Sequence, residues 1–155
     1  MTVDLVSILS GYGNSVVQQI RQNMSAANKN ATGKTSSSLR FEVKEQGSKT
    51  TLKVLGKPFI AVIETGRKAT PHYTKPSKSF VDEIRLWTQA RGINPNAAYA
   101  IAKSIHKKGT PPSSSKILSS VINDSLGNRI AKDVLDKFAK LYMTNIVSQY
   151  GNSNQ

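Results

Sequence analysis

The sequence has no cysteine and only two histidines among its 155 residues. Without cysteine the chain can form neither disulfide bonds nor thiolate zinc sites, and it is compatible with a reducing cytosol. His72 and His106 have no carboxylate or second histidine at the spacing of a metal site. We therefore expect no cysteine- or histidine-based metal site.

Long apolar runs are also missing. No stretch approaches the roughly 18 consecutive apolar residues of a membrane span, and the N-terminus lacks the basic and apolar regions of a secretory signal. We expect no membrane partner. Hydrophobic residues make up 37% of the chain, below the usual share of about 45–50%. So small a core indicates that neighbouring subunits share in the stability.

Acidic residues are few, and the basic excess is unevenly placed. The chain has 22 Lys and Arg against 9 Asp and Glu, for a net charge of +13. Residues 29–116 hold 17 of the bases and 5 of the acids, while the flanking segments are nearly balanced. A positive field of this size attracts polyanions and acidic protein surfaces. Nucleic acid or an acidic protein is therefore the expected partner.

The apolar pattern predicts an α+β fold in a single domain of residues 1–155. A 3.6-residue period predicts a helix over 3–24, and alternation over 39–54 predicts a β-hairpin with one buried face. The apolar run 59–63 fits a third strand or a short buried helix, and 117–122 is expected to be a strand. The prediction is a small antiparallel sheet packed with about four helices.

Three more helices are expected in the second half of the chain. Ser79 with Asp82 resembles a capping box, and Asn94 before Pro95 predicts another helix start. A long amphipathic helix is expected from about Asp124. Its apolar face comprises Leu126, Ile130, Val134, Phe138, Leu141 and Tyr142. Segments 25–38 and 64–78 are candidates for mobile loops, and 150–155 for a frayed tail.

Motifs for chemistry are weak. Gly33-Lys34-Thr35 resembles the end of a phosphate-binding loop, but Asn28 replaces the required first glycine and the order of helix and strand is reversed. Glu42-Val43-Lys44 has the spacing of a metal-dependent nuclease core, with only Glu64 as a further acid on nearby segments. The charged, exposed face of a hairpin explains the same residues. We expect no catalytic residue and no enzymatic activity.

Basic side chains cluster in two places. Arg67, Lys68, Lys75 and Lys78 fall in one loop, and Lys107 and Lys108 end a predicted helix. Such clusters neutralise phosphates without reading sequence. They are the candidate contacts with DNA or with other subunits. An acidic partner protein or simple solvation of the surface would use them equally well.

The order of three stretches resembles the small neck and tail-completion proteins of tailed bacteriophages. Residues 32–40 hold a threonine-glycine, basic residues and the entry to a strand. Residues 56–66 hold a glycine turn, an apolar run and a Glu-x-Gly, and 87–111 a tryptophan helix, an alanine-rich helix and Lys-Gly-Thr-Pro. The sequence departs from the family where Thr65-Gly66-Arg67 replaces the usual Phe-Gly-Thr.

The resemblance implies a structural subunit of the virion neck or tail. Such a head–tail connector or tail-completion protein forms a homo-oligomeric ring, is assembled in the host cytoplasm and needs no cofactor. Its partners would be copies of itself, other neck, portal or tail proteins, and the DNA that passes through the lumen. The alternative function is that of a basic nucleic-acid-binding protein outside a virion.

Overall fold

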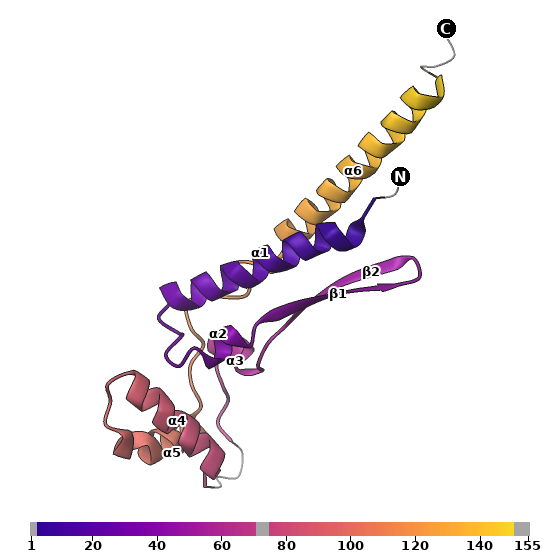
Figure 1. Cartoon of the computed structure of the whole chain (residues 1–155). Coiled ribbons are helices and arrows are strands. Elements are labelled where there is room, and N and C mark those ends of the chain that lie inside the picture. Colours follow the sequence, from indigo (N-terminus) through magenta and orange to yellow (C-terminus); the bar gives the residue numbers. More distant parts are fainter. Residues whose placement is uncertain (1–2, 71–74, 151–155) are drawn as a thin grey trace. The chain divides into compact units, whose positions relative to one another are not determined.

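The computed structural model describes residues 3–70 and 75–150. These residues form six α-helices, one 3₁₀ turn and a two-stranded antiparallel sheet (Figure 1), which confirms the predicted α+β class. In chain order the elements are α1 (Leu5–Ala26), α2 (Lys34–Ser37), β1 (Arg40–Gln46), β2 (Lys49–Leu55), α3 (Phe59–Thr65), α4 (Lys78–Ala90), η1 (Pro95–Ala97), α5 (Ala98–Lys108) and α6 (Asp124–Tyr150).

The chain packs as two compact units, each built from separate stretches of sequence. Unit 1 comprises Met1–Gln19, Arg40–Leu55 and Ser119–Gln155. Unit 2 comprises Ile20–Leu39 and Gly56–Leu118. Helix α1 therefore contributes its first part to unit 1 and its last part to unit 2. A single folding domain over residues 1–155 stays a prediction, and the expected tail lies mostly outside the described residues.

The sheet of unit 1 is the predicted hairpin. Its strands pair from Arg40 with Leu55 to Gln46 with Lys49, and Gly47 makes the turn at a φ of 59°, a conformation that glycine adopts without steric cost. The alternation places the apolar side chains on one half-buried face. These side chains are Phe41, Val43, Leu52 and Val54.

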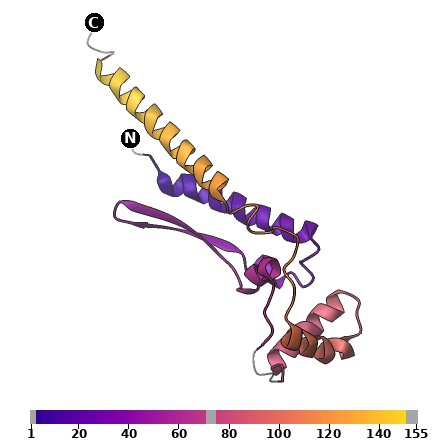
Figure 2. The same cartoon turned by 180° about the vertical axis from the view of Figure 1, so that it is seen from behind.

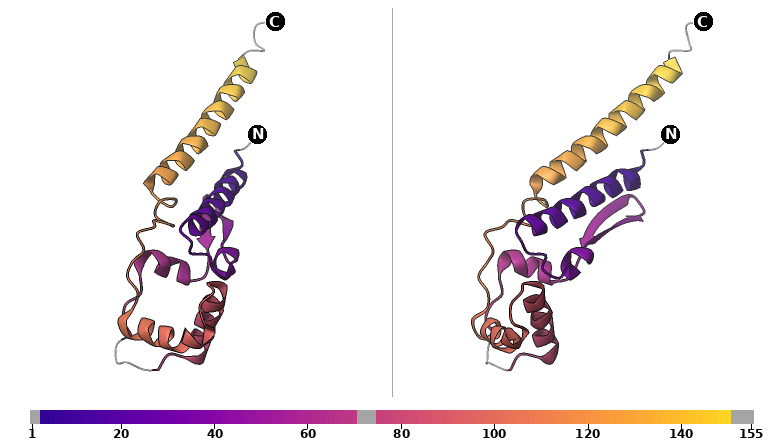
Figure 3. Two further views of the ribbon diagram at one scale, coloured as in Figure 1. Left: turned by 90° about the vertical axis from the view of Figure 1, so that its left-hand side faces the viewer. Right: turned by 60° about the vertical axis from the view of Figure 1, so that its left-hand side comes forward.

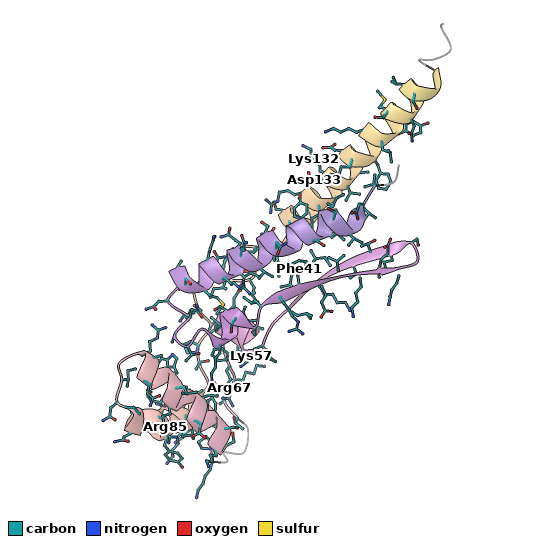
Figure 4. All side chains as sticks on the ribbon, viewed as in Figure 1. Phe41, Lys57, Arg67, Arg85, Lys132 and Asp133 are labelled. Carbon is teal, nitrogen blue, oxygen red and sulfur yellow. The ribbon has the colours of Figure 1, made fainter. Side chains whose placement is uncertain are left out.

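That face packs on the first part of α1, beside which the hairpin runs in both Figure 1 and Figure 2. A Cβ atom at Gly13 would lie 2.4 Å from Cδ2 of Phe41 and 3.0 Å from Cδ1 of Leu52. The Phe41 ring, labelled in Figure 4, thus rests directly on helix backbone. Gly13, which weakens the helix in isolation, is what permits this contact.

Helix α6 joins the same unit at its N-terminal half. Asn123 caps it by accepting a hydrogen bond at Oδ1 from the Leu126 amide, at 3.1 Å, and Leu126 is buried. Tyr12 of α1 donates its hydroxyl hydrogen bond to Asp133 Oδ2 at 2.5 Å. This bond raises the pKa of Tyr12; partial burial and the Asp133 charge add to the rise, and Arg129 opposes it.

Unit 2 has its own small core between α4 and α5, which pack as a pair in both views of Figure 3. Val81, Ala98 and Ala102 are buried there, with Phe80 and Ile84 packed against them. The alanines leave room for close approach of the two helices. The helix start expected at Asn94 is confirmed, since its side chain accepts from the Asn96 amide at 3.0 Å and η1 leads into α5.

The last part of α1 anchors the loop that follows it. Ile20 and Met24 are fully buried, and Arg21 donates to the carbonyl oxygens of Ser36 and Leu39 at 3.1 and 2.8 Å. These bonds hold the short helix α2 inside the segment 25–38. This segment was expected to be loop throughout, because its small polar residues carry no apolar period.

The run 59–63, which fits either a strand or a short buried helix, lies in helix α3, which begins after Pro58 and buries Ile60. Two other local predictions need correction. The segment 117–122 forms turns instead of a strand; Ile117 is buried and the Leu118 amide donates to Glu64 at 2.8 Å. The cap of α4 is Ser77, which accepts from the Phe80 amide, and not Ser79.

Two glycines two residues apart in α1 give a test of this packing. Gly13→Ala should lower the free energy of unfolding by about 1–3 kcal/mol, because overpacking against Phe41 outweighs the gain in helix propensity. Gly11→Ala is the matched control, since its Cβ would meet nothing within 4 Å. It should stabilise the protein by about 0.5–1 kcal/mol. Urea unfolding of both variants measures the difference; equal effects would contradict the contact.

Candidate interaction surfaces

Nearly all of the net positive charge belongs to unit 2. Its stretches carry 14 Lys and Arg and 3 Asp and Glu, a net charge of +11, whereas unit 1 carries 8 and 6, a net charge of +2. Like charges at this density repel a second copy and attract polyanions. The two units therefore offer surfaces suited to different partners.

The loop after α3 pairs with the end of α5. The Arg67 amide donates to the Thr110 carbonyl at 3.0 Å, and the Thr110 amide donates back to the Arg67 carbonyl at 2.8 Å. The Thr70 amide adds a bond to the His106 carbonyl at 2.9 Å. Residues 67–70 thus run antiparallel to 106–110, and this pairing brings Lys68 next to the segment of Lys107 and Lys108.

Two glycines make this pairing close. Gly66 and Gly109 have φ angles of 76° and 74°, which other residues rarely adopt. A Cβ atom at Gly109 would lie 2.1 Å from the Arg67 carbonyl oxygen, and one at Gly66 would lie 2.6 Å from the Thr110 carbonyl oxygen. Only residues without a side chain fit at these two positions.

Arg67 helps to stabilise this pairing of residues 67–70 with 106–110, which we call the junction. Its side chain is half-buried, with the guanidinium carbon 5.1 Å from the centre of the Phe80 ring, an arrangement that the ring's quadrupole stabilises. It also donates to the Thr70 hydroxyl at 3.4 Å. Arg67, labelled in Figure 4, therefore links the loop to the first turn of α4. The exposed cations at the junction are Lys68, Lys107 and Lys108.

The other two predicted contact residues lie nearer to α4. Lys75 and Lys78 are exposed on either side of the buried Pro76, and Lys78 is the first residue of α4. The loop cluster expected from sequence is therefore divided between the paired segment and the helix start. Residues 71–74, which include His72 and Tyr73, lie outside the described residues.

The acids of unit 2 have partners within the unit. Glu64 accepts from the Leu118 amide, Asp82 pairs with Arg85 at 2.6 Å, and Glu83 lies 3.7 Å from Lys34. Three acids cannot balance 14 bases. The surplus leaves a basic surface that a polyanion or an acidic protein could neutralise.

The hairpin motif considered for nuclease chemistry is a charged surface. Glu42 lies 3.9 Å from Arg40 and 3.6 Å from Lys44, all three on strand β1. In the part of the chain that the structure describes, no three His, Asp or Glu side chains gather where they could hold a metal ion.

Helix α6 carries two apolar stripes, where the sequence pattern predicted one face. Leu126, Ile130, Val134 and Leu141 are buried or half-buried. At about 100° per residue, a second stripe lies on another side of the helix and is exposed. It consists of Leu135, Phe138, Tyr142 and Ile146, with exposed fractions of 67, 47, 69 and 37%. Met143 and Val147, which are 63 and 65% exposed, lie further around the helix.

Unit 1 also contains an open apolar pocket of about 470 Å³. Helix α1, strand β2, the turn before α6 and the first turns of α6 form its walls. Its apolar lining consists of Val16, Leu52, Val54, Ile122, Leu126 and Ile130. Ile122 is 47% exposed at the pocket, so the apolar lining reaches the surface.

Comparison with known protein families, with curated proteins and with solved structures gave no match to this chain. Among the described residues, no helix has the length and apolar content needed to cross a membrane. The geometry and charge of the two units therefore carry the functional argument.

A pair of glycine variants tests the loop pairing in unit 2. Gly109→Ala should destabilise the protein by about 2–4 kcal/mol, since the new Cβ displaces Arg67 and breaks two backbone hydrogen bonds. Gly92→Ala is the control, because Gly92 has a similar φ of 67° but open space around it. Only the backbone cost of about 1–2 kcal/mol is expected there. Thermal unfolding of both compares the losses; an equal loss would show that the junction is loose.

Proposed function

We propose that this chain is a non-catalytic structural subunit that assembles with copies of itself into a ring in the neck or tail of a tailed bacteriophage, as a head–tail connector or tail-completion protein. The exposed stripe of α6 carries the proposal. Among the residues that the structure describes, six of the 13 exposed large apolar side chains lie on this helix between Leu135 and Val147. Full burial of one such side chain contributes about 1.5–3 kcal/mol, so covering the stripe would stabilise an assembly substantially.

The separation of charge supports the same proposal. Unit 1, which carries the stripe, has a net charge of +2, while unit 2 has +11. Copies can meet through unit 1 with little electrostatic repulsion. Unit 2 would then serve the contacts with DNA or with acidic neck, portal or tail proteins in the virion.

The sequence resemblance supplies the class of assembly. The stretch 56–66, on which the resemblance partly rests, ends at Gly66, and the stretch 87–111 contains Gly109. Both glycines lie in the loop pairing of unit 2, where Gly66 packs against the Thr110 carbonyl and Gly109 against the Arg67 carbonyl. The motifs quoted for the family thus contribute to one junction of this fold, which supports reading them together.

The second candidate function is nucleic-acid binding outside a virion. The observation that favours it is the group of exposed lysines at the junction, Lys68, Lys107 and Lys108. Phosphate binding by such lysines would be insensitive to sequence and strongly dependent on salt.

The mass of the full-length protein in solution tests the proposed assembly. Native mass spectrometry and electron microscopy should find closed rings of one size without DNA. Their stability should rise with salt, because the like charges of unit 2 are screened over about 8 Å at 0.15 M ionic strength. A protein that stays monomeric at tens of micromolar would contradict the proposal.

Binding to double-stranded DNA tests the role of the lysines. Replacing Lys68, Lys107 and Lys108 together by Gln should weaken binding, and should reduce the slope of log K against log salt by up to about 2.7. The control replaces Lys132, Lys137 and Lys140, three exposed lysines of α6 in unit 1, by Gln. Fluorescence anisotropy at several salt concentrations compares the two variants. Equal losses would mean that only net charge matters and that the junction is no site.

A further inference from the structure

The exposed stripe and the apolar pocket of unit 1 cannot meet within one chain. Leu126 and Ile130 line the pocket, and the stripe begins at Leu135 on the same continuous helix. At a rise of about 1.5 Å per residue, the helix carries each stripe residue further from the pocket. Side chains stand out on both sides of the far half of α6 in Figure 4. Both surfaces therefore need an occupant from another molecule.

We propose that the stripe of one copy, Leu135, Phe138, Tyr142 and Ile146, docks into the apolar pocket of a second copy. The inference rests on the self-assembly in the proposed function and assigns the two surfaces that make it. Pockets of about 300–1,000 Å³ accept drug-sized ligands. A pocket of about 470 Å³ can thus receive side chains from one face of a helix.

The chemistry of the pocket selects an apolar occupant. Asn123 is the one lining residue with a polar side chain, and its hydrogen-bonding groups have partners within the unit. Its amide nitrogen donates to the Ser119 and Ser120 carbonyl oxygens, and its Oδ1 accepts from the Leu126 amide. The lining carries no charge. A phosphate or a basic peptide would find nothing there to bind, whereas an apolar helix face would lose only water.

The charge of unit 1 allows a second copy to be the source of that helix. The stripe region itself carries Asp136, Lys137 and Lys140, a mixture of both signs, and unit 1 as a whole has a net charge of only +2. Two copies can therefore approach through unit 1, although the whole chain carries +13. Each copy brings one stripe and one pocket, so the surfaces are supplied in equal numbers.

The two surfaces differ, so a stripe that enters the pocket of the next copy makes a head-to-tail contact. Such a contact repeats into a ring if the rotation between copies closes, whereas two copies that exchange stripes would form a twofold dimer with both pockets filled. Two stripes packed against each other would instead give a twofold dimer with both pockets empty. The size of the assembly and the response to pocket variants separate these arrangements.

Variants of the full-length chain test the docking. Leu135→Asp with Tyr142→Asp places charge on the stripe, and Ile122→Asp places it in the pocket; all three side chains are exposed, so folding should persist. Thr144→Asp is the control, because Thr144 is exposed and lies about 140–180° around the helix from the stripe's centre. Gly127→Trp is a second pocket variant, since a Cβ at Gly127 meets nothing within 4 Å and the ring would fill the pocket.

Native mass spectrometry should find rings for the wild type and Thr144→Asp, and monomers for the stripe variant and both pocket variants. An equimolar mixture of the stripe variant with Ile122→Asp or Gly127→Trp should give a 1:1 heterodimer, because one intact pocket and one intact stripe remain. Circular dichroism checks that each variant is folded, and Gly127→Trp provides the pocket test if Ile122→Asp is not.

The failures are distinguishable. A wild-type monomer would overturn the proposed assembly itself. Wild-type rings together with rings of the stripe variant would overturn only the docking. Loss of assembly in the stripe variant, with rings or dimers retained in both pocket variants, would assign the stripe to another partner surface, such as a second stripe, and would also overturn the proposal.

Discussion

Helix α6 can bury only one of its two apolar stripes within its own chain, and the proposed assembly follows from this constraint. The stripe of Leu126, Ile130 and Val134 meets unit 1 at the half of the helix where Asn123 provides the cap and Tyr12 bonds to Asp133. Beyond that half, Leu135, Tyr142 and Val147 are each at least 65% exposed. A lone helix does not keep such a face in water without a cost in free energy, since apolar surface is stabilised by its removal from water.

The distribution of charge is the counterpart of this apolar surface. A protein with +13 spread evenly would repel its own copies at every approach. Here the acids of unit 1, among them Asp4, Glu45 and Asp124, offset most of its bases. Unit 2 keeps 14 bases with three acids, each of which already has a partner. This separation of charge is what the proposed assembly needs, with self-association in one unit and attraction for polyanions in the other.

The sequence predicted the features that depend on local periodicity. The hairpin, the cap at Asn94 and the long helices follow from side chains whose effect is confined to a few residues. Asn123 itself was not singled out, although its position directly before Asp124 is a standard signal for a helix start. The run 59–63 remained open between strand and helix because five apolar residues fit both periods, and Pro58 at the N-terminus of α3 decides for helix.

The candidate surfaces depend on contacts between distant residues, which periodicity does not contain. The sequence places Arg67 among the candidate contact residues. In the structure its guanidinium stacks on the Phe80 ring, and its backbone is hydrogen-bonded to Thr110. The segments that carry Lys68 and Lys107 lie side by side because Gly66 and Gly109 let their backbones approach to hydrogen-bonding distance. The sequence shows both glycines as breaks in the apolar pattern, but it contains no local signal that the two segments pair.

The division of α6 into two stripes also depends on contacts between distant residues. Phe138 and Tyr142 fall within the broad apolar period that begins at Leu126, so sequence assigns them to the buried face. However, α6 is 27 residues long, which is longer than the α1 segment and the hairpin that pack with it in unit 1. Apolar residues continue along α6 past the surface available to cover them within unit 1. In the proposed assembly a second copy covers this continuation, and the open pocket at the other end of α6 has the matching apolar lining.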